Sequence, residues 1–319
     1  MECRRLGDSD LEVSVVGLGC WSFANDAQWG PIDEGEALRT VHAALDGGVT
    51  LFDTAEGYGA GHSEAVLGRA LKGRRDKAVV ATKASGGHLS AEELPRALEA
   101  SLRRLGTQYV DLYQIHWPSR RVPFEETMAQ MNRLKEAGKI RSIGVSNFAV
   151  GDLREILRCG RVDCNQLPYN LFWRAIEASI VAACMNGNVS IMCYSPLAQG
   201  LLTGKFERRA DIPQSNRTGT RLYADDALAL AFAALRDVGE IARRLRVTVG
   251  QLSLAWAIAQ PGVAAVIPGA KTQRQLEENA GAANVVLEES DLDALRVLSQ
   301  PLLDHLGDDP DLWGGHRFR

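Results

Sequence analysis

The hydrophobic pattern of the chain alternates between short apolar runs and longer amphipathic ones. The short runs are mostly apolar without a break, which is typical of parallel strands buried on both faces. They cover residues 15–18, 50–52, 78–81, 112–115, 142–145, 164–166, 190–193 and 265–267. Longer runs repeat their apolar positions with a helical period and predict helices. These cover residues 34–46, 91–105, 127–137, 177–185, 248–259 and 290–299.

Strands that alternate with helices predict an α/β fold built on a parallel sheet. Two architectures have this pattern, a (β/α)8 barrel and a doubly wound sheet. A doubly wound sheet usually carries the motif G-x-G-x-x-G after its first strand. The segment here is Gly17-Leu18-Gly19-Cys20-Trp21-Ser22, which lacks the third glycine. Eight strands match the closing number of a barrel, so we predict one (β/α)8 TIM barrel domain over residues 1–319.

Three additions to a bare barrel are expected. Residues 4–13 predict an N-terminal hairpin that turns at Gly7 and Asp8. The stretch 203–224, after the seventh strand, is polar and has little periodicity. Loops of that length inside a compact domain are usually functional. The last two helical patterns predict extra C-terminal helices.

Composition and charge exclude several classes of protein. With 45% hydrophobic residues and a net charge of -4, the chain has enough apolar content to fold and no basic excess for binding nucleic acid. No run of ~18 apolar residues predicts a membrane span. The N-terminal residues are polar without a following apolar segment, so we expect no secretory signal and a cytoplasmic location. The six cysteines form no C-x-x-C motif, so reduced thiols and no metal site are expected.

Candidate chemistry lies where the predicted strands end, because barrel active sites form at the C-terminal ends of strands. Asp53 and Tyr58 follow the second strand, Lys83 the third and His116 the fourth. A lysine beside a tyrosine lowers the pKa of the phenol, and an aspartate neutralises the buried lysine. A histidine can orient a substrate oxygen. Such a set can protonate a carbonyl oxygen, and a nicotinamide cofactor would have to supply the hydride.

Five segments in order carry a resemblance to a known family. They are residues 48–59, 81–83, 112–116, 142–148 and 194–201. Together they resemble the aldo-keto reductase family and extend over nearly the whole chain. His62-Ser63-Glu64 is similar to the subgroup of bacterial sugar and inositol dehydrogenases and potassium-channel β subunits.

The resemblance implies a role for each matching residue. Tyr58 would be the general acid or base, Lys83 and Asp53 would tune it, and His116 would place the carbonyl. The nicotinamide would be held by Ser146, Asn147, Gln166 and, through ring stacking, Tyr194. The pyrophosphate side would be lined by Ser195, Leu197, Gln199, Leu201 and Lys205. The adenosine end would be held by Gly269, Lys271, Gln275, Glu278 and Asn279, and the substrate pocket walled by Trp21, Trp29 and Trp117.

One position departs from the pattern of many NADPH-selective members, which carry an arginine where Gln275 stands. The 2′-phosphate of NADPH needs a cation. Lys271 and Arg274 are near enough in the chain to supply it. We therefore expect NADPH or NADP as cofactor, with NADH use possible.

The resemblance implies an NAD(P)H-dependent oxidoreductase that reduces aldehydes and ketones or oxidises the corresponding alcohols or sugars. Two alternatives stay open at this point. One is a non-catalytic NADPH-binding regulatory subunit of the channel-β type. The other is an aldolase that forms a Schiff base on Lys83. Aromatic walls suit small carbonyls and sugars alike, so the sequence chooses neither the substrate nor the oligomeric state.

Overall fold

The computed structural model describes residues 1–27, 29–213, 215–315 and 317–318. Within these residues, eight parallel strands form one sheet in the order β10-β9-β8-β7-β6-β5-β4-β3. Their bounds are β3 Leu18–Gly19, β4 Leu51–Asp53, β5 Val79–Ala84, β6 Val110–Ile115, β7 Ile140–Ser146, β8 Cys164–Pro168, β9 Ser190–Tyr194 and β10 Val263–Val266. Each of the eight strands predicted from the sequence overlaps or adjoins one of these.

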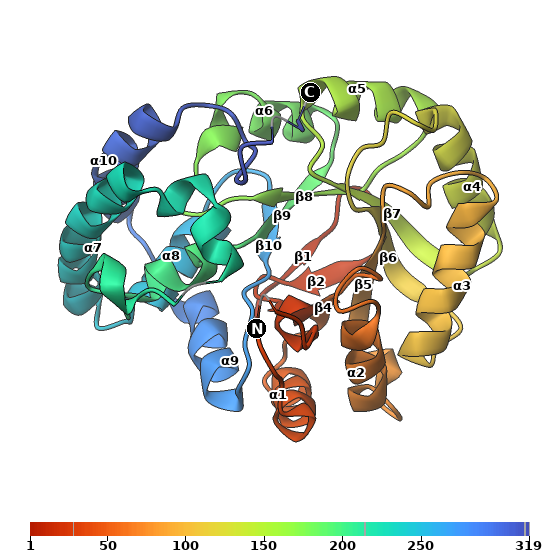
Figure 1. The fold of residues 1–319 in the computed structure, drawn as a ribbon, viewed down its shortest axis with the longest axis horizontal. Helices are drawn as coiled ribbons and strands as arrows, with labels where there is room; N and C mark the ends of the chain where they lie inside the picture. Colours follow the sequence, from red (N-terminus) through yellow and green to blue (C-terminus); the bar gives the residue numbers. More distant parts are fainter. Residues whose placement is uncertain (28, 214, 316, 319) are drawn as a thin grey trace.

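The two edge strands of this sheet meet and close it. The backbone N–H of Val266 donates to the carbonyl of Val15 at 2.9 Å, and that of Gly19 donates to Pro268 at 3.0 Å. Parallel bridges join Val16 to Val266 and Gly19 to Gly269. The predicted (β/α)8 barrel is therefore confirmed, with the helices arranged around the strands (Figure 1).

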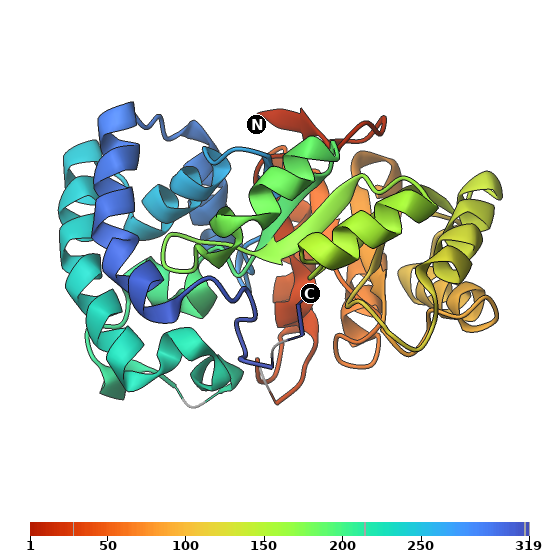
Figure 2. The ribbon, with the colours of Figure 1, turned by 90° about the horizontal axis from the view of Figure 1, so that it is seen from above.

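The helices lie outside the strands, and a large apolar core fills the space between the two layers. Their bounds are α1 Glu34–Asp46, α2 His62–Ala70, α3 Glu93–Leu105, α4 Phe124–Glu136, α5 Val150–Cys159, α6 Ile180–Asn186, α7 Asp225–Leu245, α8 Val249–Ile258, α9 Gln273–Ala280 and α10 Glu289–Leu306. Helices α7 and α10 pack side by side at one edge of the molecule (Figures 1 and 2). Among the described residues, no helix has the length and apolar character needed to cross a membrane.

The predicted N-terminal hairpin is present and covers one end of the barrel. Strands β1 (Cys3–Arg5) and β2 (Glu12–Ser14) pair antiparallel. Leu6, Leu11 and Val13 are fully or almost fully buried and pack in one apolar cluster with residues of the barrel strands. Figure 2 shows the hairpin at the end of the barrel away from the C-terminal tail. The hairpin does not cover the opposite end of the barrel, where the strands have their C-terminal ends.

The structure differs from the predicted elements in several places. The pattern does not predict helices α2, α5 and α9. It indicates a charged helix only over 236–246 and one that ends at 299, whereas α7 begins at Asp225 and α10 continues to Leu306. The predicted helix 177–185 is split into a 3-10 turn, η3 (Ala175–Ala178), and the short helix α6. The polar stretch 203–224 contains three short 3-10 turns rather than unbroken loop: η5 Arg209–Asp211, η6 Asn216–Gly219 and η7 Arg221–Tyr223.

Candidate active site

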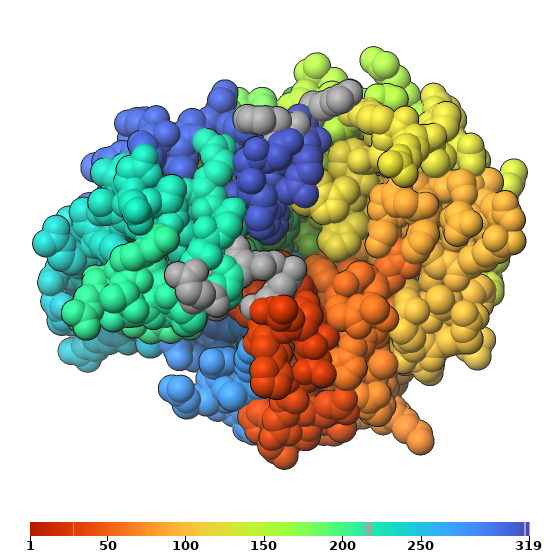
Figure 3. All heavy atoms as spheres, in the orientation of Figure 1, coloured from red at the N-terminus to blue at the C-terminus, as the bar shows by residue number. Residues whose placement is uncertain are grey.

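A deep cavity opens at the C-terminal ends of the barrel strands. Its volume is about 1360 Å³, which is larger than a small substrate alone requires. Figure 3 shows a hollow at the centre of one face, bordered by the C-terminal tail and by N-terminal residues. Most of the site residues implied by the resemblance line it: Trp21, Trp29, Asp53, Tyr58, His116, Trp117, Ser146, Asn147, Gln166, Tyr194, Ser195, Leu197, Gln199, Lys205, Gly269, Lys271, Gln275, Glu278 and Asn279.

Lys83 links the proposed catalytic residues at the cavity floor. Its side chain is fully buried, and its ammonium group donates to Asp53 Oδ1 at 2.6 Å and to the carbonyl of Thr54 at 2.8 Å. It also donates to the hydroxyl oxygen of Tyr58 at 3.3 Å. These bonds use all three donors of an ammonium group. The structure thus brings Asp53, Tyr58 and Lys83 together from β4, the loop after it and β5.

The hydroxyl oxygen of Tyr58 accepts a hydrogen bond from Lys83, so the hydroxyl can donate its own hydrogen bond to another acceptor. The ring is partly exposed and lines the cavity. Gly59, with φ 58°, holds the loop in place: a Cβ there would lie 1.9 Å from the carbonyl oxygen of Ala24. Any larger residue would therefore push this loop, and Tyr58 with it, off Ala24. The phenol proton of Tyr58 is therefore not used by the bond to Lys83, and the residue faces the cavity.

Burial sets the ionisation of these groups. It raises the pKa of the Tyr58 phenol above its ordinary value, although the charge of Lys83 opposes that shift. Lys83 thus lowers the pKa of Tyr58 as the sequence led us to expect, but burial outweighs it. Burial alone would lower the pKa of Lys83, but Asp53 and Tyr58 outweigh it and hold that pKa above its usual value. A protonated phenol beside a charged ammonium is the resulting state.

The imidazole of His116 is neutral at physiological pH. Burial, and secondarily the charge of Lys83, lowers the pKa of His116 to about 3. Its ring contacts that of Tyr58 edge-on, with centroids 5.7 Å apart. A neutral imidazole in that position can bind a carbonyl oxygen without carrying charge.

A Schiff base on Lys83 does not suit this environment. The nucleophile would be the neutral amine, whereas the pKa of Lys83 is raised and each of its donors is engaged. Its side chain has no exposed surface and does not reach the described cavity wall. Lys83 is therefore not placed to act as the amine nucleophile that the aldolase alternative requires.

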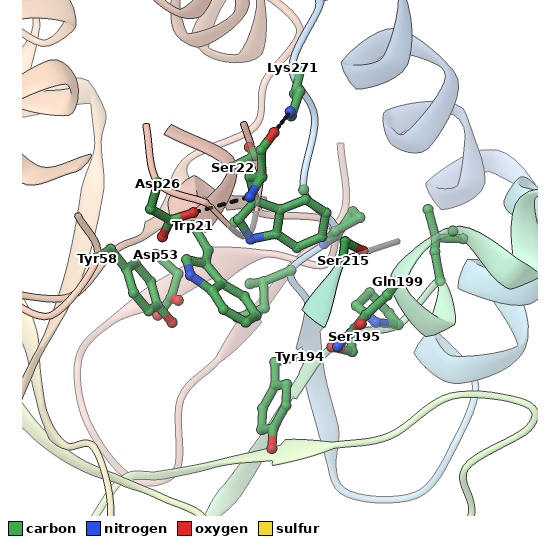
Figure 4. A pocket seen from close by; sticks show the side chains of 18 of the residues that line it. Trp21, Ser22, Asp26, Asp53, Tyr58, Tyr194, Ser195, Gln199, Ser215 and Lys271 are labelled. Atoms are coloured by element: carbon green, nitrogen blue, oxygen red, sulfur yellow. Dashed lines mark hydrogen bonds between the residues drawn. The ribbon is translucent and has the colours of Figure 1, made fainter. Parts of the chain in front are cut away.

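Aromatic rings form a continuous arc around Tyr58 and His116. Trp21 stacks on Tyr58 with centroids 5.7 Å apart, and Trp29 packs edge-on against Trp21 at 5.4 Å. On the other side, Trp117 meets Trp313 of the C-terminal tail at 6.3 Å. Figure 4 shows Trp21, Tyr58 and Asp53 grouped at one side of the cavity. The three tryptophans expected to wall the substrate pocket do line this cavity.

A hydrogen-bonded cluster lies at the ends of β7, β8 and β9, where the resemblance places the nicotinamide. Asn147 donates to the carbonyl of His116 at 3.0 Å and accepts from the Tyr194 hydroxyl at 2.9 Å. Ser146 donates to the carbonyl of Gln166 at 3.0 Å. The amide of Gln166 donates to Asp53 Oδ2 at 2.7 Å. Gln166 therefore contacts the catalytic group directly as well as the cavity.

The backbone after β9 has the shape of an anion cradle. Ser195, Ala198, Gln199 and Gly200 all have positive φ, between 48° and 104°. Such conformations cost about 1–3 kcal/mol each for non-glycine residues and gather at ligand clamps. Within the segment, the N–H groups of Ala198 and Gly200 donate to the carbonyls of Ser195 and Leu197, at 2.8 and 2.9 Å. The ammonium of Lys205 lies close by, since a Cβ added to Gly200 would be 3.1 Å from it. A cation beside a segment of this conformation fits a pyrophosphate.

The far end of the cavity is formed by the start of α9. The backbone N–H of Lys271 donates to the side chain of Gln275 at 2.8 Å, and its ammonium group bonds to the carbonyl of Trp29. The Lys271 contact is drawn in Figure 4. Asn279 reaches the carbonyl of Gly269 at 3.5 Å. Arg274 is exposed on the cavity wall. Cationic side chains at a helix N-terminus suit a phosphate group, so this end fits an adenosine phosphate.

Some site residues were not found from the sequence, and one expected residue is elsewhere. Gln114, fully buried on β6, donates to Asp53 Oδ2 at 3.3 Å. Arg317 reaches the cavity from the C-terminal tail. Trp313 lines the cavity too, in the tail 305–313 that the sequence suggests could close over the substrate. Leu201 is fully buried and does not belong to the described cavity wall. The described residues contain no group of three or more His, Cys, Asp or Glu side chains placed to hold a metal ion.

The chain is similar to known proteins over most of its length. The chain is 34% identical to the Bacillus subtilis protein "Aldo-keto reductase YhdN", covering 96% of each chain. The solved glycerol dehydrogenase AKR11B4 of Gluconobacter oxydans superposes with a TM-score of 0.84 at 31% identity, over 97% of this chain and 96% of that one. A Klebsiella pneumoniae aldo/keto reductase, solved in complex with NADP and acetate, gives 0.75 at 32% identity, over 93% and 95%.

The family model for the aldo/keto reductase family matches residues 15–300, which is most of the chain. That span contains the barrel, the buried Lys83 cluster and the cradle after β9. The family uses NADP(H), and the donors at both ends of the cavity fit such a cofactor. This chain belongs to the aldo/keto reductase family and is an oxidoreductase of that family.

Proposed function

We propose that this protein reduces the carbonyl group of small aldehydes or ketones, or oxidises the corresponding alcohols or sugars, with Tyr58 as the general acid or base. The observation that carries the proposal is the bond from Lys83 to the Tyr58 oxygen at 3.3 Å. Because the Tyr58 oxygen accepts in this bond, its hydroxyl hydrogen can be donated to a ligand in the cavity. A general acid must lie within hydrogen-bond reach of its acceptor, and the cavity position of Tyr58 allows that.

In the direction of reduction, the Tyr58 hydroxyl donates its proton to the substrate oxygen as negative charge develops there. The phenolate oxygen that results stays beside the ammonium of Lys83, which stabilises it. Asp53 in turn keeps Lys83 charged through their 2.6 Å bond. In oxidation the same phenolate takes the proton back from an alcohol.

His116 would act by orientation. Because its pKa is lowered to about 3, the ring is uncharged and binds the substrate oxygen without competing as an acid. Its ring packs edge-on against that of Tyr58, and both residues line the cavity. The substrate carbonyl would therefore lie between them.

NADPH, when bound, supplies the hydride. Ser146, Asn147 and Gln166 would hold its carboxamide, and Tyr194 would pack against its ring. The cradle at Ser195–Gly200 with Lys205 would hold the pyrophosphate, as its backbone conformation favours. Gly269, Lys271, Gln275, Glu278 and Asn279 would hold the adenosine end, with Arg274 beside them.

The test is oxidation of NADPH and, separately, NADH by the purified protein with a panel of aldehydes, ketones and sugars. The proposal expects turnover that depends on both cofactor and carbonyl. A protein that binds NADPH tightly, as followed by tryptophan fluorescence, but turns over no carbonyl would instead fit the regulatory-subunit alternative. Binding of neither nucleotide would overturn the cofactor assignment as well.

A further inference from the structure

The C-terminal tail, residues 307–315 and 317–318, is folded against the substrate end of the cavity. Arg221, in the long segment after β9, holds it there. The backbone N–H of Arg221 donates to the carbonyl of Leu312 at 2.9 Å, and its guanidinium group donates to the carbonyls of Asp309, at 3.2 Å, and Leu306. The dark blue tail reaches the rim of the hollow in Figure 3. Its side chains are therefore part of the site.

One arginine of the tail is fixed in place by a buried carboxylate. Asp311, whose side chain has no exposed surface, accepts from Arg317 Nε at 3.0 Å and from Arg317 Nη2 at 2.9 Å. It also accepts from the backbone N–H groups of Arg317 and Trp313, each at 3.1 Å. A paired, planar guanidinium of this kind loses little further freedom when it binds a ligand.

The guanidinium lies flat against the pocket wall. The Cζ of Arg317 is 3.7 Å from the ring centroid of Trp117 and 5.5 Å from that of Trp313. Trp117 follows His116 directly in the chain, so Arg317 lies beside the reacting end of the cavity, which it lines. Two of the five N–H donors of a guanidinium are used by Asp311. The side chain is 42% exposed and lines the cavity.

We propose that Arg317 selects carbonyl substrates that carry a carboxylate group, which its remaining donors would bind. This inference rests on the proposed reductase function and goes beyond it by naming the substrate class. A carboxylate is the planar partner that arginine recognises best, and the aromatic arc would hold the carbon skeleton between it and Tyr58.

The other charges around the cavity agree with this assignment. Lys205, Lys271 and Arg274 line the described wall at the cofactor end, and Lys83 is buried against Asp53. Asp26 lies on the wall formed by Trp21 and Trp29, where it accepts from the backbone N–H of Trp29 at 3.0 Å. The ammonium group of Lys271 bonds to the carbonyl of the same Trp29, so this wall carries charges of both signs. Arg317 is the cation that lies against Trp117, next to His116 in the chain.

The experiment compares 4-carboxybenzaldehyde with its uncharged methyl ester as substrates of the full-length protein. Three forms are assayed with NADPH: wild type, Arg317→Met and Arg243→Met. Methionine keeps an unbranched stem against Trp117 but removes the charge. Arg243 is the matched control, because it is exposed on α7 and pairs with Glu240 away from the cavity. Benzoate and benzamide binding to the NADP-saturated protein, followed by tryptophan fluorescence, gives a readout independent of turnover.

Wild type and Arg243→Met should prefer the acid over the ester by roughly tenfold or more in kcat/KM, mainly through KM. In Arg317→Met that ratio should fall to about one, whatever the change in the turnover of the ester. An equal ratio in wild type and Arg317→Met would overturn the inference. Reduction of the ester as fast as the acid by wild type would overturn it while leaving the proposed function intact. Benzoate binding that depends on Arg317, without any turnover, would retain the anion site and overturn the proposed function.

Discussion

The ammonium group of Lys83 lies 3.3 Å from the hydroxyl oxygen of Tyr58. Because that oxygen accepts, the phenol keeps its proton for a ligand on its cavity side. Burial raises the pKa of Tyr58, so the phenol is protonated when a carbonyl arrives. In the proposed mechanism the same lysine would then stabilise the phenolate that proton transfer produces. Lys83 would assist the tyrosine during the transfer rather than keep it ionised beforehand.

Replacing Lys83 by methionine should therefore lower kcat by about 10²-fold or more, because the developing phenolate loses its counter-charge. The variant should also lose about 3–5 kcal/mol of folding stability, since Asp53 is left buried without its cation. Steady-state rates and denaturant unfolding measure the two effects. Lys135→Met, at an exposed position on α4, is the control. A Lys83→Met enzyme with normal kcat would contradict the role given to Lys83.

The pH dependence of reduction should lack a histidine ionisation. His116 has a pKa lowered to about 3, and the pKa of Tyr58 is raised, so neither group changes charge between about pH 5 and 9. We expect log kcat for reduction to be flat across that range. A step near pH 6.5, the ordinary value for histidine, that disappears in His116→Gln would show that the ring titrates in the working enzyme.

The stability of the protein should fall with acid for the same reason. A histidine whose folded pKa lies below its unfolded value binds fewer protons in the folded state at intermediate pH. The unfolded state is therefore favoured as pH falls from about 6.5 toward 3. Urea unfolding of wild type and His116→Gln at several pH values checks this. The variant should have the shallower acid slope, and identical slopes would contradict a buried neutral His116.

Cofactor choice should depend on Arg274. It is exposed on the cavity wall at the start of α9, where Gln275 provides no charge. Removing it in Arg274→Ala should raise the Kd of NADPH about tenfold, as expected for loss of a charge-assisted phosphate contact, and leave that of NADH unchanged. Separate fluorescence titrations of the two nucleotides measure this. Equal weakening of both would place Arg274 away from the 2′-phosphate.

The tail should loosen when Arg221 is replaced. Arg221→Met removes the guanidinium bonds to the carbonyls of Asp309 and Leu306, each worth about 0.5–1.5 kcal/mol. The expected results are faster hydrogen exchange in residues 308–315 and a higher carbonyl KM, with the NADPH Kd unchanged. Arg208→Met, at an exposed position in the same segment, is the control. Unchanged exchange in the tail would show that other contacts hold it.

Much of the barrel follows from local pattern. A strand buried on both faces must be continuously apolar, which is why all eight strands could be located. Helix α1 was bounded at Glu34 and Asp46, as the structure has it, because Asp33 caps its start and glycines follow its end. Helices α2 and α5 begin after Gly61 and Ala149, and neither residue has a side chain that can accept a hydrogen bond from the first turn of the helix. Their short amphipathic patterns therefore lack the capping signal that marks the start of a helix.

The site was predictable where one short motif carries it. Asp53 and Tyr58 share a segment, and Lys83 follows the predicted strand 78–81, so the resemblance located the cluster that β4 and β5 bring together. Gln114 gave no such signal, because it lies within a strand and only the closed barrel turns it toward Asp53. Arg317 is distant in sequence from every motif. Its place beside Trp117 depends on how the tail folds back over the cavity.

The most direct test of the account is the turnover of Tyr58→Phe with NADPH and a carbonyl substrate of the wild-type protein. The substitution removes only the hydroxyl oxygen that bonds to Lys83. We predict that kcat for reduction falls by about 10²–10⁴-fold, the usual contribution of a general acid, while NADPH affinity and Tm stay near wild type. Turnover within about twofold of wild type would contradict the assignment of Tyr58 as the proton donor.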